Sequence, residues 1–210
     1  MDVDEAQARM REIQRIMETA TLFTLLPGTA AIVGGVLVFL GCGASYWLLN
    51  SLDFAEIMRL SMPNRATLCL MWFAIAIVSV AVNVFLTARL AARQQITLNP
   101  RPARVAMFSL TPCLVVAAVL TFQFLVDWEP REIRYITPVW MLLYGTGVYT
   151  AGLFSIRAPR VLGLVFLLTG IVALLYFPDY GVISAGVSFG LLHVLFGAYV
   201  LTKQRQVAAP

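Results

Sequence analysis

The sequence predicts an all-α, polytopic membrane protein with six transmembrane helices and with both termini in the cytoplasm. Three observations lead to this fold class. Only 12% of the residues are charged and 60% are apolar, whereas a soluble domain usually carries about 25% charge. Uncharged runs near 20 residues, the length that crosses a bilayer, recur along the chain. Arginine and lysine gather in alternate connecting segments, as they do on the cytoplasmic side of membrane proteins.

The chain divides into a short amphipathic start, one membrane domain and a polar tail. Residues 1–20 are predicted to form a cytoplasmic amphipathic helix that leads into the first span, because apolar residues recur at spacings of three and four between charged ones. Residues 21–202 form the six-helix transmembrane domain. Residues 203–210 are a polar cytoplasmic tail.

The spans follow the uncharged runs and are interrupted by prolines and charges. We expect them at about 21–43, 66–87, 105–126, 135–156, 161–177 and 181–202. Pro27 should kink the first span and Pro112 should bend the third. Tyr46 and Trp47 should follow the first span as interfacial anchors. A short interfacial helix is predicted within 50–64, where Asp53 and Glu56 have capping-box spacing and Pro63 ends the run.

The orientation follows from the basic residues. Six spans place 11 arginines and lysines on the side of the termini and 4 on the other side, so both termini are predicted to be cytoplasmic. This layout resembles small six-span bacterial inner-membrane proteins, although it matches no named family. The basic inner face should attract anionic lipids, with four arginines at the headgroup level, Arg89, Arg93, Arg101 and Arg104. No soluble basic domain is present, so nucleic acid is not an expected partner.

The sixth span carries the only histidine of the chain beside three glycines. Gly186, Gly190, His193 and Gly197 are spaced so that, at about 100° per residue, all four fall within roughly 60° on an α-helix. Glycine on one face lets another backbone approach closely, and a polar side chain in hydrocarbon should face the protein interior. We therefore predict that this face packs against another helix, a protein partner or a second copy of the chain.

His193 is also the first candidate for a ligand site, because it lies near the predicted bilayer midplane. It could line a polar cavity with five other span residues, Tyr144, Thr146, Tyr149, Asn83 and Gln123. The open alternatives are a neutral structural imidazole, a proton-transfer group, and a haem- or quinone-binding redox role. A single histidine excludes bis-histidine haem within one chain, and His/Met ligation would use Met107 or Met141. The residues identify no cofactor.

The sequence lacks the residues that several kinds of catalytic or ligand-binding site require. The predicted spans contain no Asp, Glu, Lys or Arg, and the chain has no Walker, GxSxG, HExxH or dinucleotide motif. The three cysteines have no CxxC spacing, so neither a metal site nor a disulfide framework is expected. The charges of 127–134 are of mixed sign and should form ion pairs in solvent. An enzyme is therefore not the favoured class, and we expect no catalytic residue.

Two non-enzymatic functions remain beside the redox alternative. The favoured one is an accessory, sensory or assembly component of a membrane complex. The other is an uncoupled transporter or channel for a small or lipophilic solute. It draws on a weak internal similarity, in which Gly28-Thr29 followed by Gly35 matches Gly145-Thr146 followed by Gly152. These segments would enter the membrane from opposite sides, as in an inverted 3+3 repeat.

Overall fold

The computed structural model describes residues 28–93, 101–127, 130–153 and 157–208, together with positions 5, 7 and 9. The predicted amphipathic helix of 1–20, the start of the first span and Pro27 lie outside this part of the chain. The described segments fold into helices and contain no strand. The all-helical class predicted from the sequence is therefore confirmed.

Five helical segments are long and apolar enough to cross a membrane, namely Gly28–Leu49, Met62–Arg93, Phe108–Val126, Arg157–Tyr176 and Pro178–Gln206. They correspond to α2 (Gly28–Leu49), α3 (Met62–Arg93), most of α4 (Arg101–Asp127), α7 (Arg157–Tyr176) and the final helical run. The predicted fourth span forms α6 (Ile136–Leu153), which is not among these five. Its tyrosines, threonines and glycines lower its hydropathy below that of its neighbours.

The final run is one helical rod of three parts that follows the 3-10 turn η2 (Pro178–Tyr180). It begins as α8 (Gly181–Ala185), continues as the π-helical segment η3 (Gly186–Leu192) and ends as α9 (His193–Ala208). Hydrogen bonds in a π-helix join residues five apart, so each turn takes up more residues than the 3.6 of an α-helix. The direction in which a side chain beyond η3 points therefore differs from the direction found by counting 100° per residue along the whole rod.

Helix ends differ from the predicted ones in ways that proline and arginine explain. α2 continues to Leu49, so Tyr46 and Trp47 lie on its last turn, both exposed, and do not follow it. α3 begins at Met62 because proline is tolerated in a first turn, and Pro63 starts this helix without ending the preceding one. At its other end α3 extends to Arg93. Pro112 lies inside α4.

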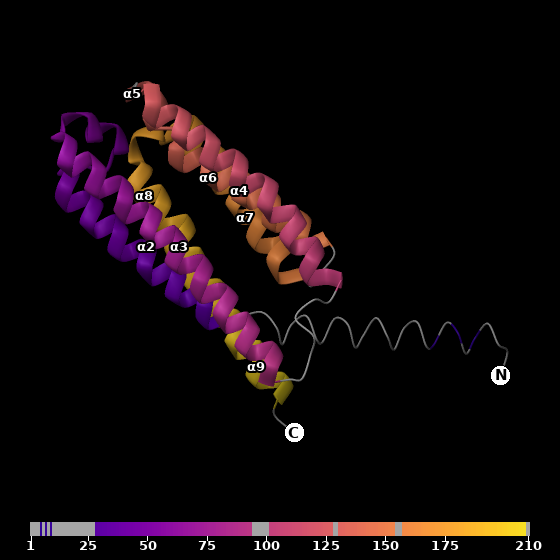
Figure 1. Ribbon diagram of the computed structural model, residues 1–210. Helices are drawn as coiled ribbons and strands as arrows, with labels where there is room; N and C mark the ends of the chain where they lie inside the picture. The colour runs from indigo at the N-terminus through magenta and orange to yellow at the C-terminus, as the bar shows by residue number, and fades with distance from the viewer. Residues whose placement is uncertain are drawn as a thin grey trace.

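The long helices form two groups of three (Figure 1). In the first group α2 lies between α3 and α9, and in the second α6 lies between α4 and α7. In the first group, α2, α3 and α9 are predicted spans one, two and six. In the second group, α6, α7 and α4 are predicted spans four, five and three. If each span of the first half of the chain is exchanged with its counterpart in the second half (one with four, two with five, three with six), the main helix contacts of the first group become those of the second. This is the symmetry that an inverted 3+3 repeat requires.

The groups are joined at the end where α5 (Pro130–Ile133) and the 3-10 helix η1 (Phe54–Arg59) lie. A buried apolar cluster there takes one residue from each of five segments, namely Leu49, Ile57, Leu68, Ile133 and Val182. The amide of Val182 donates to the carbonyl of Leu52 at 3.0 Å. The carboxylate of Asp53 accepts from the amide of Ala55 at 2.8 Å and caps η1. The predicted capping box is only half formed, because the Asp53 amide donates to Ser51 and the Glu56 carboxylate pairs with Arg59.

Candidate functional site

The candidate site is the place where the histidine rod meets the second group. His193 is the first residue of α9, directly after the π-helical segment, and Tyr144 lies in the middle of α6. The phenolic oxygen of Tyr144 is 2.8 Å from Nε2 of His193. The other ring nitrogen, Nδ1, lies 3.4 Å from the carbonyl oxygen of Ser188. Both nitrogens of the imidazole are thus within hydrogen-bond reach of one partner each.

For a neutral imidazole these two contacts define one tautomer. A backbone carbonyl only accepts, so Nδ1 carries the hydrogen that points to Ser188. Nε2 then holds a lone pair and accepts from the Tyr144 hydroxyl, which is the arrangement of a neutral imidazole. The Ser188 side chain is fully buried and donates to the carbonyl of Ser184 at 2.6 Å. The polar groups at this point of the rod are therefore satisfied within the chain.

Aromatic rings surround the pair. Phe166 of α7 is 0% exposed and meets the His193 ring edge-on, with centroids 5.4 Å apart and planes at 81°. Phe189 stacks on the imidazole at 6.0 Å and 19°. Tyr144 packs on Phe166 at 4.9 Å. The aromatic cluster of Tyr144, Phe166, Phe189 and His193 thus joins α6, α7 and the rod.

This geometry does not fit an axial haem ligand. Such a ligand needs Nε2 or Nδ1 free to face a wide planar ring, but Nε2 accepts from Tyr144 and Nδ1 is directed at Ser188. Met141, one of the methionines considered from the sequence, is 2% exposed and packs in the cluster between α6 and α7. The side chain of Met107 is not described.

The glycines of the rod face α2. A Cβ added at Gly35 of α2 would lie 2.6 Å from the carbonyl oxygen of Gly190, and one added at Gly190 would lie 2.9 Å from the Phe39 ring. Gly197 and Gly28 oppose each other backbone to backbone, so a Cβ at either would clash with the carbonyl of the other. Gly186 lies nearest to Cys42 and Phe39, at ordinary contact distance.

His193 and these glycines therefore face different neighbours, although the sequence predicted one narrow face for all four. The prediction counted 100° per residue through Gly186–Leu192, and the π-helical winding of that segment makes the count wrong for Gly186 and Gly190 relative to His193. Gly197 follows His193 by four residues within α9 and stays about 40° from it, and the longer imidazole side chain reaches Tyr144 of α6 from there. As a result, one side of the rod packs on α2 through glycine, and the other packs on α6 and α7 through Phe189, Leu192, His193 and Phe196.

The other predicted cavity residues lie elsewhere. Thr146 is exposed on α6 and donates to the carbonyl of Leu142 at 2.8 Å. Tyr149 offers its backbone as the surface against which Gly163 of α7 packs. Asn83 is exposed on α3 and Gln123 is exposed on α4. Of the six residues predicted to line a polar cavity, the structure brings Tyr144 and His193 into contact.

Sequence reasoning missed three parts of the site. Ser188 and Phe189 lie on the same rod five and four residues before His193, and a helical count could have paired Phe189 with it. Nothing in the sequence pairs Phe166 with either residue. The close glycine contacts between α6 and α7 were missed as well: a Cβ added at Gly145 would lie 3.0 Å from the carbonyl oxygen of Gly163, and one added at Gly163 would lie 2.8 Å from that of Gly145, slightly farther than in the Gly28–Gly197 pair.

A polar junction lies at the end of the bundle that holds η1. Arg134 pairs with Asp179 at 2.9 Å, which links the α5 segment to η2; the sequence had placed the ion pairs of Arg134 within its own loop. Burial raises the pKa of Asp53 above its usual value, and the nearby Asp179 adds to this, while the Ala55 amide and Arg134 oppose it. Among the described residues, no group of three or more His, Cys, Asp or Glu side chains is arranged to hold a metal.

The four arginines predicted at the headgroup level divide between two helices. Arg89 and Arg93 lie in the last turns of α3, whereas the sequence had placed them in a loop. Arg101 and Arg104 begin α4, and their side chains are not described. Comparison of the chain with known protein families, curated proteins and solved structures gives no match.

Proposed function

We propose that this chain is a non-catalytic accessory, sensory or assembly component of a membrane complex, with six spans, both termini in the cytoplasm and a location in a bacterial inner membrane. The five apolar helices support a multi-pass membrane protein. α6 lies lengthwise between α4 and α7 (Figure 1), and its 18 residues extend about 27 Å at 1.5 Å per residue. That length is close to the hydrocarbon thickness of a bilayer, about 30 Å.

The observation that carries the functional proposal is the uncovered side of α3. This helix packs mainly on α2, and only 6% of its most apolar window is buried inside the chain. Ala76, Val80 and Asn83 are exposed one helical turn apart, on one side of α3. The side-chain amide of Asn83 makes no hydrogen bond in the part of the chain that the structure describes.

Small and polar residues are the ones through which membrane helices associate, and an amide in hydrocarbon is costly without a partner. We therefore assign this side of α3 to one helix of a partner membrane protein that offers Asn83 a hydrogen bond. The glycine face, considered from the sequence as the partner surface, is covered by α2 of the same chain. His193 is likewise engaged within the chain, which favours a structural role for it.

A photo-crosslinking residue at position 83, in native membranes, tests the partner assignment. The matched control is position 85, because Phe85 is 63% exposed and points about 200° away around the same helix. A discrete protein adduct at 83, with lipid adducts alone at 85, is the expected result. Lipid adducts alone at both positions would refute the assignment. An adduct with a second copy of the chain would show that the partner is another copy, in a homo-oligomer.

Cysteine labelling tests the six spans. The native thiols Cys42, Cys69 and Cys113 are free and would first be replaced. Glu132→Cys and Arg157→Cys flank α6, and only the first should react with an impermeant reagent added from outside. Equal reaction of both positions would show that α6 does not cross, and reaction of Arg157→Cys alone would invert the topology.

A second function, an uncoupled transporter, is favoured by one observation. The two groups of helices have the exchange symmetry of an inverted repeat, a design common in transporters. The glycines that first suggested the repeat do not occupy equivalent contacts, because Gly28 and Gly35 meet α9 whereas Gly145 and Gly152 meet α7. Swelling of proteoliposomes in glycerol or urea, followed by light scattering, distinguishes this function from the first.

A further inference from the structure

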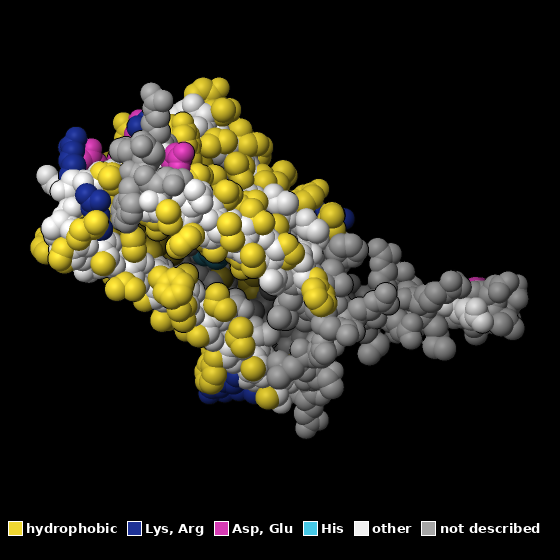
Figure 2. Space-filling model, turned by 45° about the horizontal axis from the view of Figure 1, so that its top comes forward, with side chains coloured by type: hydrophobic (Ala, Val, Ile, Leu, Met, Phe, Trp, Pro, Cys, Tyr) yellow, Lys and Arg dark blue, Asp and Glu magenta, His cyan; other side chains and the backbone are white. Residues whose placement is uncertain are grey.

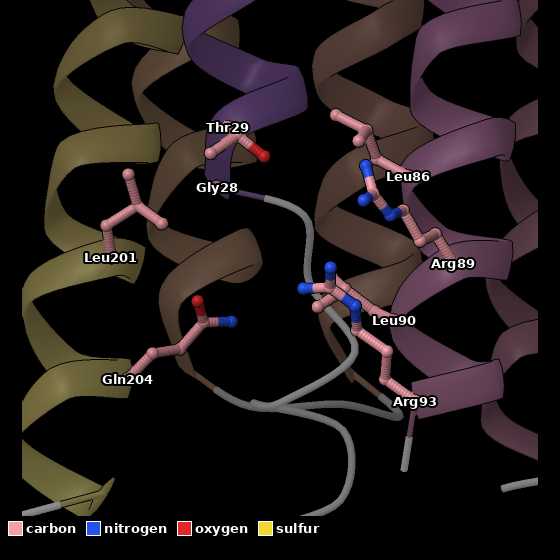
Figure 3. A pocket seen from close by; sticks show the side chains of 8 residues that line it. All are labelled: Gly28, Thr29, Leu86, Arg89, Leu90, Arg93, Leu201 and Gln204. Atoms are coloured by element: carbon pink, nitrogen blue, oxygen red, sulfur yellow. The ribbon is translucent and has the colours of Figure 1, made fainter. Parts of the chain in front are cut away.

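A pocket of about 200 Å³ opens between the ends of three helices of the first group. It lies where α2 begins and where α3 and α9 end (Figure 3). Figure 3 shows the guanidinium groups of Arg89 and Arg93 reaching from α3 toward the start of α2, and the amide of Gln204 directed into the same space from α9. The lining comprises Gly28, Thr29, Leu86, Arg89, Leu90, Arg93, Leu201 and Gln204.

The charge of this pocket is unbalanced. None of the helices α2, α3 and α9 contains an aspartate or glutamate anywhere along its length. No ion pair engages Arg89 or Arg93 in the part of the chain that the structure describes. Two guanidinium groups that line one pocket without a carboxylate repel each other, and an anion between them removes that repulsion. The planar guanidinium donors match phosphate oxygens in particular.

The rest of the lining is apolar. Leu86 and Leu90 lie on the same helix as the arginines, and Leu201 faces them from α9. A soluble phosphate compound gains nothing from three leucines, whereas a phospholipid places its glycerol and the start of its acyl chains beside such a wall. Because the arginines are in the last turns of a long apolar helix, the pocket lies at the level where lipid headgroups occur.

We propose that this pocket binds the phosphate headgroup of an anionic membrane phospholipid. The two arginines bind the phosphate, Thr29 and Gln204 supply neutral hydrogen-bonding groups for the polar end, and the leucines contact the acyl chains. A zwitterionic headgroup brings a cation into the same space and is disfavoured by the arginines. The inference rests on the proposed membrane location but not on the accessory role, and cysteine labelling tests that location separately.

The test measures retention of phosphatidylglycerol by the purified full-length protein in native mass spectrometry, with phosphatidylcholine as the zwitterionic probe. We expect wild type to retain phosphatidylglycerol in preference. R89Q combined with R93Q should weaken the apparent affinity about tenfold or more, since each basic group near an anionic surface strengthens binding several-fold. Leu90→Trp, which fills the pocket and keeps both arginines, should weaken it as well.

The matched control is R157Q combined with R205Q, which removes the same charge from exposed positions that do not line the pocket. If this control weakens retention as much as R89Q with R93Q, the attraction is diffuse and the proposal fails. Free glycerol phosphate is the last probe. If it raises the melting temperature of the protein as much as phosphatidylglycerol does, the site binds a soluble phosphate and the lipid assignment is overturned.

Discussion

The hydroxyl of Tyr144 and the imidazole of His193 meet at 2.8 Å, and this contact joins the central helix of one group to the long rod of the other. It lies inside a cluster of aromatic rings, with Phe166 fully buried beneath both side chains. Figure 2 shows that apolar side chains dominate the visible surface around the histidine. The histidine lies where the two groups of helices meet. The only histidine is thus placed where it can hold the groups together.

Removal of this hydrogen bond should destabilise the protein moderately. Tyr144→Phe is expected to lower the free energy of unfolding by about 1 kcal/mol, because Nε2 of His193 is left without its donor. The double change Y144F with H193F should cost less than the sum of the single changes, since neither partner is then left unsatisfied. Unfolding in mixed detergent micelles measures these values. Tyr149→Phe, on the same helix, is the control, and an equal loss there would contradict a role for the Tyr144 contact.

The glycine contact between α2 and α9 should tolerate no side chain. Gly197→Ala places a methyl group on the Gly28 carbonyl and 3.0 Å from the amide nitrogen of Ile32, so we expect a loss of about 1–3 kcal/mol. Gly43 is the control, because it lies on α2 with no atom within 4 Å of an added Cβ. Gly43→Ala should be neutral or stabilise by about 0.5–1 kcal/mol through helix propensity. Similar losses for both changes would show that α2 and α9 do not pack this way.

The pH dependence of stability should include a contribution from Asp53. Burial raises the pKa of this carboxyl in the folded chain above its ordinary value of 3.8, so the folded state holds the proton more tightly than the unfolded state. Its contribution is therefore fully present below pH 3.8 and is lost as the pH rises through the higher, folded-state pKa. Unfolding midpoints measured across this interval should fall more steeply for wild type than for Asp53→Asn. Asparagine keeps an oxygen for the Ala55 amide but does not titrate, so parallel curves would contradict this assignment.

The fold was predictable where a local pattern decides it. Uncharged runs predicted the helices, and Asp53 of the predicted capping box caps η1, although Glu56 pairs with Arg59. The helix ends were predicted less well, because Arg89 and Arg93 end an apolar run in sequence but are good helix formers and continue α3. α6 was predicted as a span but is not among the five helices that are apolar enough to cross a membrane. Its tyrosines and glycines, which pack in the centre of its group, make it less apolar than a run of leucines and valines would be.

The candidate site was only half predictable for a different reason. His193 and Tyr144 were both identified because polar side chains in apolar runs are rare. Their pairing, and the enclosure by Phe166, depend on contacts 49 and 27 residues apart along the chain, and no periodicity encodes such contacts. The exposed positions of Asn83 and Gln123 depend on which helices are neighbours, which the sequence of a single chain does not contain.

The π-helical segment has a consequence for insertions and deletions in this chain. It sets the rotational phase between α8, which contacts α6 and α2, and α9, whose Gly197 meets α2. Deletion of one residue from Gly186–Leu192 would let the wider π-helical turn close to an α-helical one, whereas insertion of one residue would rotate everything beyond it by about 100° relative to what precedes it. Gly197 would then turn away from Gly28, and a bulkier side chain would take its place. This seven-residue segment should therefore tolerate the loss of one residue better than the gain of one.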